Sequence, residues 1–179
     1  MKNREYKSRR NKLAKAIGKD GVAIIATADL STRTNDTDYP FRSDSDFYYL
    51  TGFLEPNSLM LLAPGRPEGE FILCVRPKNP LMETWEGHME GLNGVIKNYD
   101  VDQSFDIANI DVVLKDLLYG KEKIFYSIGK NNFYDEKVTE VFKVLRESQR
   151  QGGVVPNEIV SIDTIIHEMR QIKSRKEIQ

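Results

Sequence analysis

A continuous apolar run near the start of the chain sets the first constraint on the fold. Residues 22–26 read Val-Ala-Ile-Ile-Ala and lie between Gly21 and a long polar stretch. A short apolar run bounded in this way predicts a strand that other elements cover on both faces. Such a strand lies inside a sheet, so we expect residues 22–26 to form a central strand.

The segments around this run alternate between helix and strand patterns. Apolar residues at near-helical spacing predict an opening helix over residues 4–17. The same reasoning predicts strands at 47–51, 58–63, 70–75, 124–128 and 159–162, helices at 107–118 and 138–152, and a last helix capped by Asp163 with Ile165, Ile166, Met169 and Ile172 on its apolar face. Strands alternating with helices predict an α/β layer fold, and the turn signal at residues 64–69 makes the sheet mixed.

The charge balance argues against two classes of partner. The chain has 26 Lys+Arg and 27 Asp+Glu, a net charge of -1, so no long-range field favours nucleic acid or an anionic membrane. No apolar run approaches the about 20 residues that a spanning helix needs, and none has the form of a signal peptide. We therefore expect a soluble, cytoplasmic protein with no nucleic-acid or membrane partner.

Motifs for nucleophilic or zinc chemistry are not found in the sequence. The only cysteine, Cys74, lies in the apolar run 71–75, which predicts a buried structural thiol and excludes a disulfide within the chain. The two histidines, His88 and His167, lie far apart and lack ligand-spaced neighbours, so a zinc or di-metal site has little support.

Residues 29–46 form a polar stretch that is long for a loop in a compact domain, and long loops often carry function. Its carboxylates occur in pairs at positions 36/38 and 44/46 and could hold a hard cation, but the glycine and distal glutamate of a calcium loop are missing. We therefore predict no metal there. In the structural alternative, Asp44 and Asp46 cap turns while Arg33 and Arg42 pair with neighbouring carboxylates.

A second stretch, residues 82–91, holds the only tryptophan, Trp85, among several charged side chains. A large aromatic residue in polar company is typical of an interface or a pocket edge. The alternative is an ordinary core residue. The polar neighbours favour a surface position for Trp85.

The last residues have the spacing of a helix start. Ser174 and Glu177 match a capping box, in which each side chain satisfies a backbone N–H at a helix N-terminus. The chain stops at Gln179, which leaves few residues for the helix that the cap would stabilise. We expect an interrupted sequence, and the alternative is a frayed polar tail whose spacing arose by chance.

Three segments in chain order resemble the N-terminal domain of bacterial aminopeptidase P. Aminopeptidase P is the Xaa-Pro aminopeptidase of metallopeptidase family M24, and it is grouped with creatinase and prolidase. The matching residues are Asp36, Tyr39-Pro40-Phe41-Arg42, residues 45–53 and Glu55-Pro56 within 33–62, then residues 83–87, and finally residues 167–174 with Glu177-Ile178. The resemblance implies a three-layer α/β/α fold with a mixed β-sheet. It also implies that residues 1–173 are the N-terminal domain and that residues 174–179 are the truncated start of a "pita-bread" catalytic domain.

The resemblance implies a parent enzyme that removes the first residue from peptides with proline at position two. Two metal ions, usually Mn²⁺, belong to the missing catalytic domain, so we expect this chain to hold no catalytic residue and to be inactive alone. Its expected partners are its own catalytic domain, further copies in a homo-oligomer (dimer or tetramer) and peptide substrates. Asp36 and Trp85 match family positions at the substrate cleft, with Arg42 as their electrostatic support.

Two other functions compete with this interpretation. A stand-alone peptide- or protein-binding module of the same fold would have no peptidase activity. A self-contained enzyme that uses the aspartate-rich loop as a metal site is the remaining alternative. One departure from the family concerns the cleft edge, because Glu86-Gly87-His88-Met89 lacks the basic character expected in some relatives.

Overall fold

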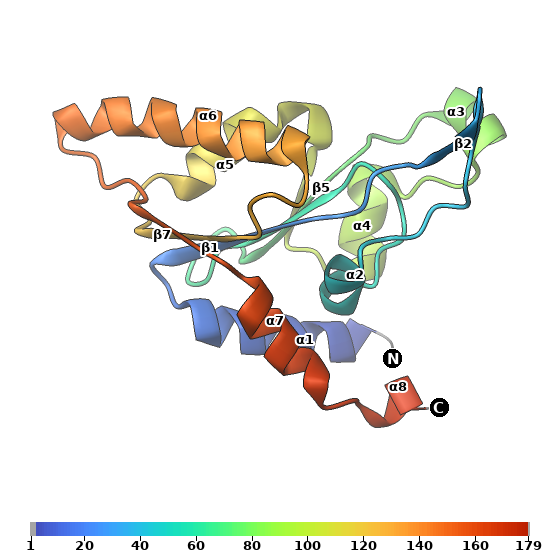
Figure 1. Cartoon of the computed structure of the whole chain (residues 1–179), viewed down its shortest axis with the longest axis horizontal. Coiled ribbons are helices and arrows are strands. Elements are labelled where there is room, and N and C mark those ends of the chain that lie inside the picture. The colour runs from blue at the N-terminus through green and yellow to red at the C-terminus, as the bar shows by residue number, and fades with distance from the viewer. Residues whose placement is uncertain (1–2, 179) are drawn as a thin grey trace.

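The computed structural model describes residues 3–178, except for the side chains of residues 3, 151 and 176. A six-stranded mixed sheet forms its centre, and a small two-stranded hairpin lies apart from it (Figure 1). The strands are β1 (Gly21–Ala26), β2 (Thr32–Thr34), β3 (Thr37–Asp38), β4 (Leu59–Leu62), β5 (Phe71–Val75), β6 (Gln103–Asp106), β7 (Lys123–Tyr126) and β8 (Glu158–Val160).

The order of the large sheet is β6-β5-β4-β1-β7-β8. β1 pairs in parallel with β7, β7 with β8 and β5 with β6, whereas β4 runs antiparallel to both of its neighbours. The prediction of a mixed sheet is therefore confirmed. β1 lies inside the sheet and five of its six residues are buried, as the apolar run at residues 22–26 predicted.

Helices cover both faces of the sheet. They are α1 (Asn3–Ile17), α2 (Ser45–Thr51), α3 (Pro80–Glu86), α4 (Gly91–Tyr99), α5 (Ile110–Leu118), α6 (Asn132–Ser148), α7 (Asp163–Gln171) and α8 (Arg175–Ile178), with 3-10 turns at Ile107–Asn109 and Gln149–Gln151. None of the helices within residues 3–178 is both long enough and apolar enough to cross a membrane.

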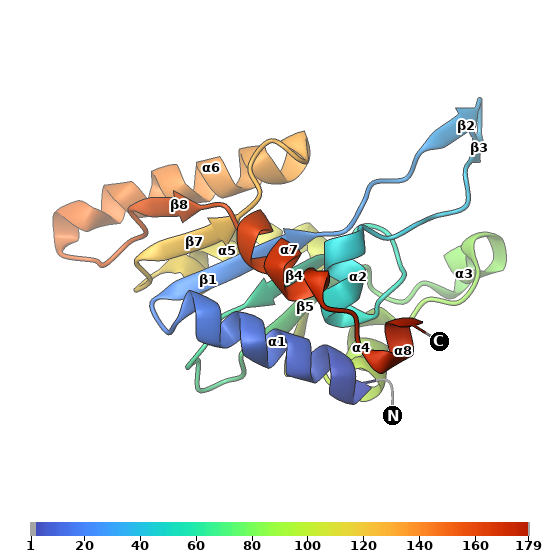
Figure 2. The same ribbon diagram turned by 60° about the horizontal axis from the view of Figure 1, so that its bottom comes forward.

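Two hydrophobic clusters, one on each face of the sheet, produce the three layers. Alternate residues of β1 point to opposite faces, so Ile24 packs with α5 and α6 while Ile25 packs with α1, α2, α4 and α7. Figure 2 shows α1 and α7 in front of the sheet and α6 behind it. The predicted three-layer α/β/α arrangement is confirmed.

The strand predicted at residues 47–51 is wrong, because this segment is helix α2. Asp44 caps the helix, and its Oδ1 accepts hydrogen bonds from the N–H groups of Asp46 (2.8 Å) and Phe47 (3.0 Å). At the other end Gly52 has φ 70°, a left-handed conformation that glycine adopts readily, and its N–H reaches the Tyr48 carbonyl. The apolar residues sit at helical spacing, with Phe47 and Leu50 both buried.

Smaller differences concern the ends of elements. Asp163 is the first residue of α7, not its cap, because Ile162 occupies the cap position and makes no side-chain cap bond. Ile172, predicted on the apolar face of that helix, follows the helix and is 87% exposed. The helices α3 and α4 and the edge strand β6 had no predicted counterpart.

Candidate functional site

The polar stretch that follows β1 contains the small β2–β3 hairpin. Every residue from Asp29 to Pro40 is exposed, and the hairpin extends away from the rest of the molecule (Figures 1 and 2). Asp36 lies in its two-residue turn beside Asn35, which has φ 42°. The long loop is therefore a projecting arm, which places the Asp36 carboxylate in solvent at its tip.

Trp85 lies on helix α3, none of whose residues is buried. Its side chain is 87% exposed, and Leu81 on the same helix is 79% exposed. The surface position that the sequence favoured for Trp85 is correct. α3 lies at the same end of the molecule as the β2–β3 hairpin (Figures 1 and 2).

The three predicted cleft residues come from three separate stretches of chain. Arg42 is exposed in the segment between β3 and α2, so it lies at the base of the hairpin while Asp36 lies at its tip. The structure thus brings the hairpin with Asp36 and the helix with Trp85 to one end of the molecule. A cavity opens at the carboxyl ends of β1 and β7, and none of the three residues lines it. Their role at a substrate cleft stays a prediction.

The other arginine of the loop has an aromatic neighbour in the structure. The guanidinium carbon of Arg33 lies 6.0 Å from the ring centre of Tyr39, across the hairpin. The N–H of Tyr39 donates to the Ser31 carbonyl over 2.8 Å, which closes the base of the hairpin. Such cation–π contacts contribute about 0.5–1 kcal/mol at exposed sites, so they favour the hairpin only modestly.

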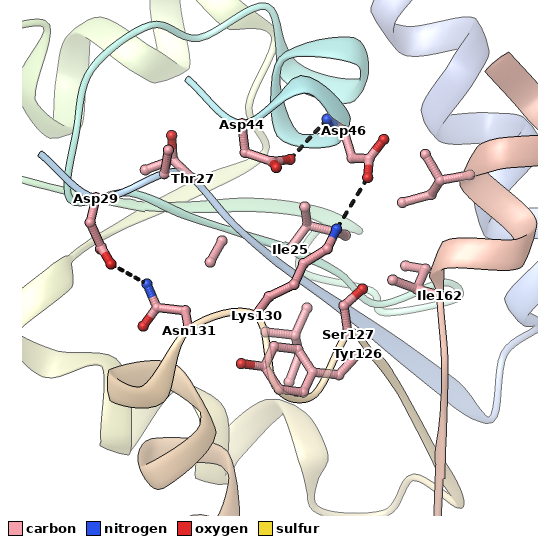
Figure 3. A pocket seen from close by; sticks show the side chains of 14 residues that line it. Ile25, Thr27, Asp29, Asp44, Asp46, Tyr126, Ser127, Lys130, Asn131 and Ile162 are labelled. Carbon is pink, nitrogen blue, oxygen red and sulfur yellow. Dashed lines mark hydrogen bonds and ion pairs between the residues drawn. The ribbon is translucent and has the colours of Figure 1, made fainter. Parts of the chain in front are cut away.

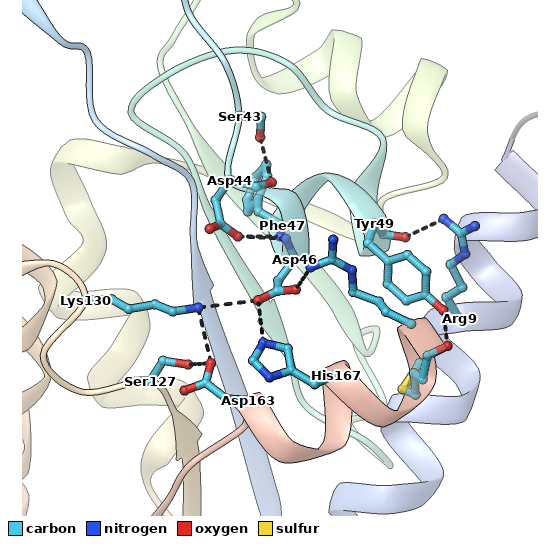
Figure 4. Close-up of polar contacts among 12 residues, drawn as sticks. Arg9, Ser43, Asp44, Asp46, Phe47, Tyr49, Ser127, Lys130, Asp163 and His167 are labelled. Atoms are coloured by element: carbon cyan, nitrogen blue, oxygen red, sulfur yellow. Dashed lines mark hydrogen bonds and ion pairs between the residues drawn. The ribbon is translucent and has the colours of Figure 1, made fainter. Parts of the chain in front are cut away.

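A buried carboxylate, Asp46, lies among basic side chains from distant parts of the chain (Figure 4). Its side chain is 6% exposed, and Oδ1 pairs with Arg170. Oδ2 lies 3.4 Å from Lys130 Nζ and 3.9 Å from His167 Nε2. Asp46 therefore does not cap a turn, as the structural alternative proposed, but joins α2 to α7 and to the segment after β7.

Lys130 also reaches Asp163, at 3.2 Å from its Oδ1. Burial works against ionisation of Asp163, but hydrogen bonds from Ser127 and Lys130 outweigh it and lower the pKa of Asp163. Both members of this pair are consequently charged at neutral pH. The sequence did not reveal the cluster, since Asp46 is separated from Lys130 by 84 positions and from Arg170 by 124.

One oxygen or nitrogen each of Asp46, Asp163 and His167 lie within 4.8 Å of one another, a spacing that could suit a metal ion. A divalent cation would have to displace the Lys130 ammonium from between the two carboxylates. The local charges are already balanced by Lys130 and Arg170. We therefore interpret these residues as an ion-pair cluster that fastens α7 to the sheet.

A cavity of about 390 Å³ opens beside this cluster, at the carboxyl ends of β1 and β7 (Figure 3). The chain leaves β1 toward α2 on one face of the sheet and leaves β7 toward α6 on the other, and such divergence opens a crevice. Ile25 and Ile162 contribute apolar walls. Polar groups in the lining are paired with one another, since Asn131 donates to Asp29 over 2.8 Å and Lys130 contacts Asp46. These pairs therefore do not indicate which kind of ligand the cavity would bind.

Cys74 is buried and unpaired, as its apolar surroundings predicted. Burial raises the pKa of its thiol to about 12. The thiolate is the reactive form of cysteine, so this residue is not a nucleophile near neutral pH.

The capping box at the end of the described chain is formed. The Glu177 N–H donates to Ser174 Oγ (3.3 Å) and the Ser174 N–H to Glu177 Oε2 (2.9 Å), and α8 begins at the next residue. Glu177 also lies 3.0 Å from Arg9 of α1. The proposed domain boundary at residues 173/174 stays a prediction, although these contacts fix where α8 starts relative to α1.

The fold and its projecting elements define a class of protein, three-layer α/β/α domains of the aminopeptidase P type. A solved structure of Pseudomonas aeruginosa aminopeptidase PepP superposes with a TM-score of 0.94 at 38% identity, covering 98% of this chain and 40% of that chain. The structure of zinc-substituted Escherichia coli aminopeptidase P in complex with product gives 0.92 at 29% identity, with the same coverage.

Sequence comparisons agree with the structural ones. The family described as aminopeptidase P, N-terminal domain, matches residues 6–126, so the chain belongs to that family. The Xaa-Pro aminopeptidase of Escherichia coli (strain K12) is 30% identical over 99% of this chain and 41% of its own length. That of Haemophilus influenzae is 30% identical over 98% and 38%. The chain spans about two fifths of the length of these curated relatives.

Proposed function

We propose that this domain controls access of peptides to the active site of a metal-dependent Xaa-Pro aminopeptidase, without catalytic residues of its own. The observation that carries the proposal is the exposure of Trp85, on a helix that buries none of its residues, at the end of the molecule where the Asp36 hairpin projects. Two structural elements that have no buried residue need another reason for their shape, and contact with a second domain or subunit supplies one.

The physical argument concerns the selectivity of an exopeptidase. Such an enzyme must hold a short N-terminal segment and reject internal chain, which a wall beside the reacting centre achieves by steric exclusion. The Trp85 indole can pack on a proline ring or on peptide backbone. Asp36 can pair with donors near the free amine, and Arg42 at the base of the arm supports its charge.

The metal chemistry is proposed for the separate catalytic domain, with two Mn²⁺ ions that would activate the attacking water. The exposed side chains Leu81, Trp85 and Tyr39 give this end of the domain an apolar surface that suits contacts in a homo-oligomer or with the catalytic domain. The compartment proposed is the cytoplasm, where the lone buried thiol of Cys74 stays reduced.

The first experiment compares the 179-residue chain with a protein that also carries the catalytic domain. An Xaa-Pro peptide and added Mn²⁺ are supplied to both. We expect cleavage only by the longer protein, and cleavage by this chain alone would contradict the assignment of the chemistry to the other domain. Tight peptide binding by the chain alone would favour the stand-alone binding module instead.

The second experiment tests the access role within the longer protein. Trp85→Ala and Asp36→Ala are each expected to weaken cleavage of Xaa-Pro peptides roughly tenfold in kcat/KM, since each removes a substrate contact of about 1.4 kcal/mol. Glu140→Ala on the exposed outer face of α6 is the matched control and should leave cleavage unchanged. Equal activity of all three variants would rule out a substrate contact by either residue.

A further inference from the structure

The helix that carries Trp85 contributes no residue to either hydrophobic cluster. α3 is seven residues long and has no buried residue, so the core contributes nothing to its position. An isolated helix of this length is unstable in water, because few hydrogen bonds offset the cost of ordering the chain. Polar contacts with the rest of the domain must therefore hold α3 in place.

One side chain of α3, Glu83, makes most of these contacts. Its Oε1 accepts a hydrogen bond from the Met89 N–H over 2.9 Å. The same atom lies 3.1 Å from Lys78 Nζ and 3.5 Å from His88 Nδ1. Lys78 precedes α3 while His88 and Met89 follow it, so a single carboxylate joins the chain that enters the helix to the chain that leaves it.

The segment that follows α3 is attached to the rest of the domain. Met89 is 3% exposed, and the next residue, Glu90, donates its N–H to Glu55 Oε1 over 2.7 Å. Glu55 follows α2 and lies in a segment that the core holds through the fully buried Phe53. Glu83 thus connects α3 to a fixed point.

A second glutamate of α3 also connects the helix to the rest of the domain and helps to fix its orientation. Glu86 pairs with Arg76, which directly follows β5. Residues three apart share a helix face, so Glu83 and Glu86 both point toward the domain. Trp85 lies on a different face and projects into solvent, 87% exposed.

We propose that Glu83 is a positioning residue that holds Trp85 at a fixed place by tying α3 to Lys78, His88 and Met89. The importance of this for peptide cleavage rests on the proposed function, because a wall excludes wrong substrates better when it does not move. The positioning itself does not depend on that function and is measured separately.

The measurement uses the fluorescence of the 179-residue chain, in which Trp85 is the only tryptophan. In time-resolved anisotropy, Glu83→Ala should raise the amplitude of the nanosecond depolarisation roughly twofold, because the helix loses its tether. Glu83→Gln keeps an acceptor for the Met89 N–H but loses the charge that attracts Lys78, so its amplitude should lie between those of the wild type and Glu83→Ala. Glu140→Ala removes an exposed glutamate far from α3 and should match the wild type.

Circular dichroism and urea unfolding show whether the effect is local. Since α3 lies outside both core clusters, all three variants should unfold at the wild-type midpoint. Wild-type anisotropy in folded Glu83→Ala, or loss of the folded state in that variant, would overturn the proposal.

A final measurement separates this inference from the proposed function. Glu83→Ala and Trp85→Ala are placed in the protein that also carries the catalytic domain, and cleavage of Xaa-Pro peptides is measured. A raised KM in both variants supports the positioning of Trp85 for substrate. Altered anisotropy with unchanged cleavage would leave Glu83 as the tether of α3 and count against the access role of Trp85.

Discussion

Arg9 of α1 and Tyr49 of α2 contact each other twice. The Nη1 of Arg9 donates a 3.0 Å hydrogen bond to the Tyr49 carbonyl, and its guanidinium carbon lies 4.0 Å from the centre of the Tyr49 ring. The next residue, Arg10, repeats the pattern by donating to the Leu50 carbonyl over 3.0 Å. Carbonyls in the last turn of a helix have no partner within the helix, so α1 supplies donors that α2 needs.

Arg9→Ala should destabilise the domain by about 2 kcal/mol, because a carbonyl loses its donor in a buried setting and the packing on Tyr49 is lost. Urea unfolding followed by circular dichroism measures the change. Arg4→Ala on the same helix is the control, since Arg4 is exposed and should cost no more than about 0.5 kcal/mol. Equal losses in both variants would show that the Tyr49 contacts add nothing.

Gly52 and Gly18 test how closely α2 approaches α1. Both have left-handed backbones, with φ of 70° and 72°, but a Cβ on Gly52 would lie 2.4 Å from the Tyr6 ring whereas one on Gly18 would meet nothing within 4 Å. Gly18→Ala should cost about 1 kcal/mol from the backbone alone. Gly52→Ala should cost about 1–3 kcal/mol more, for overpacking, and thermal unfolding of the two variants gives the difference directly. Similar losses would mean that Tyr6 moves aside freely.

The central part of the fold could be predicted because its patterns are local. A run of apolar residues at 22–26 was enough to identify β1, and the turn at residues 64–69 identified the antiparallel pair β4–β5. The strand predicted at residues 47–51 failed because aromatic side chains favour strands in general. The Asp44 cap, the Gly52 stop and the spacing of Phe47 and Leu50 indicated a helix, and they decide the structure.

The candidate sites could be predicted only where one segment contains the whole feature. Trp85 stood out because polar neighbours surround an aromatic residue, and the loop 29–46 stood out because it is long and polar. Within that loop only the family resemblance selected Asp36. The contacts of Asp46 join residues more than 80 positions apart, and the edge strand β6 exists through its pairing with β5. Features of that kind depend on tertiary packing, which no local spacing records.

The buried thiol of Cys74 predicts a loss of stability in alkali. Its pKa is raised by burial to about 12 in the folded chain, whereas the unfolded thiol keeps the ordinary value of 9.0. Between these values the unfolded state releases a proton that the folded state retains, so stability falls with rising pH by about 1.4 kcal/mol per unit. The free energy of unfolding measured at pH 9 and pH 10 should therefore fall more steeply in the wild type than in Cys74→Ala. Parallel slopes would contradict a buried thiol.

Asp46 offers the strongest test of the ion-pair cluster, since it is the buried member while its partners keep access to water. Its side chain is 6% exposed, compared with 36% for Arg170 and 49% for Lys130. Removing one charge of a fully buried pair costs about 3–5 kcal/mol, but here both cations can be hydrated again. We therefore expect Asp46→Asn to cost about 1.5–3 kcal/mol in urea unfolding, the range for a lost hydrogen bond to a charged group.

The loss of stability in Asp46→Asn should also be local. The carboxylate joins α2 to α7 through Arg170 and to the segment after β7 through Lys130. Amide hydrogen exchange should speed up in α7 before it changes in the central strand β1. Asp36→Asn at the hairpin tip is the matched control and should change stability by no more than about 0.5 kcal/mol. If α7 kept its protection in Asp46→Asn, the contacts of Ile162 and Ile166 with the core would be holding that helix, and the cluster would be dispensable for its docking.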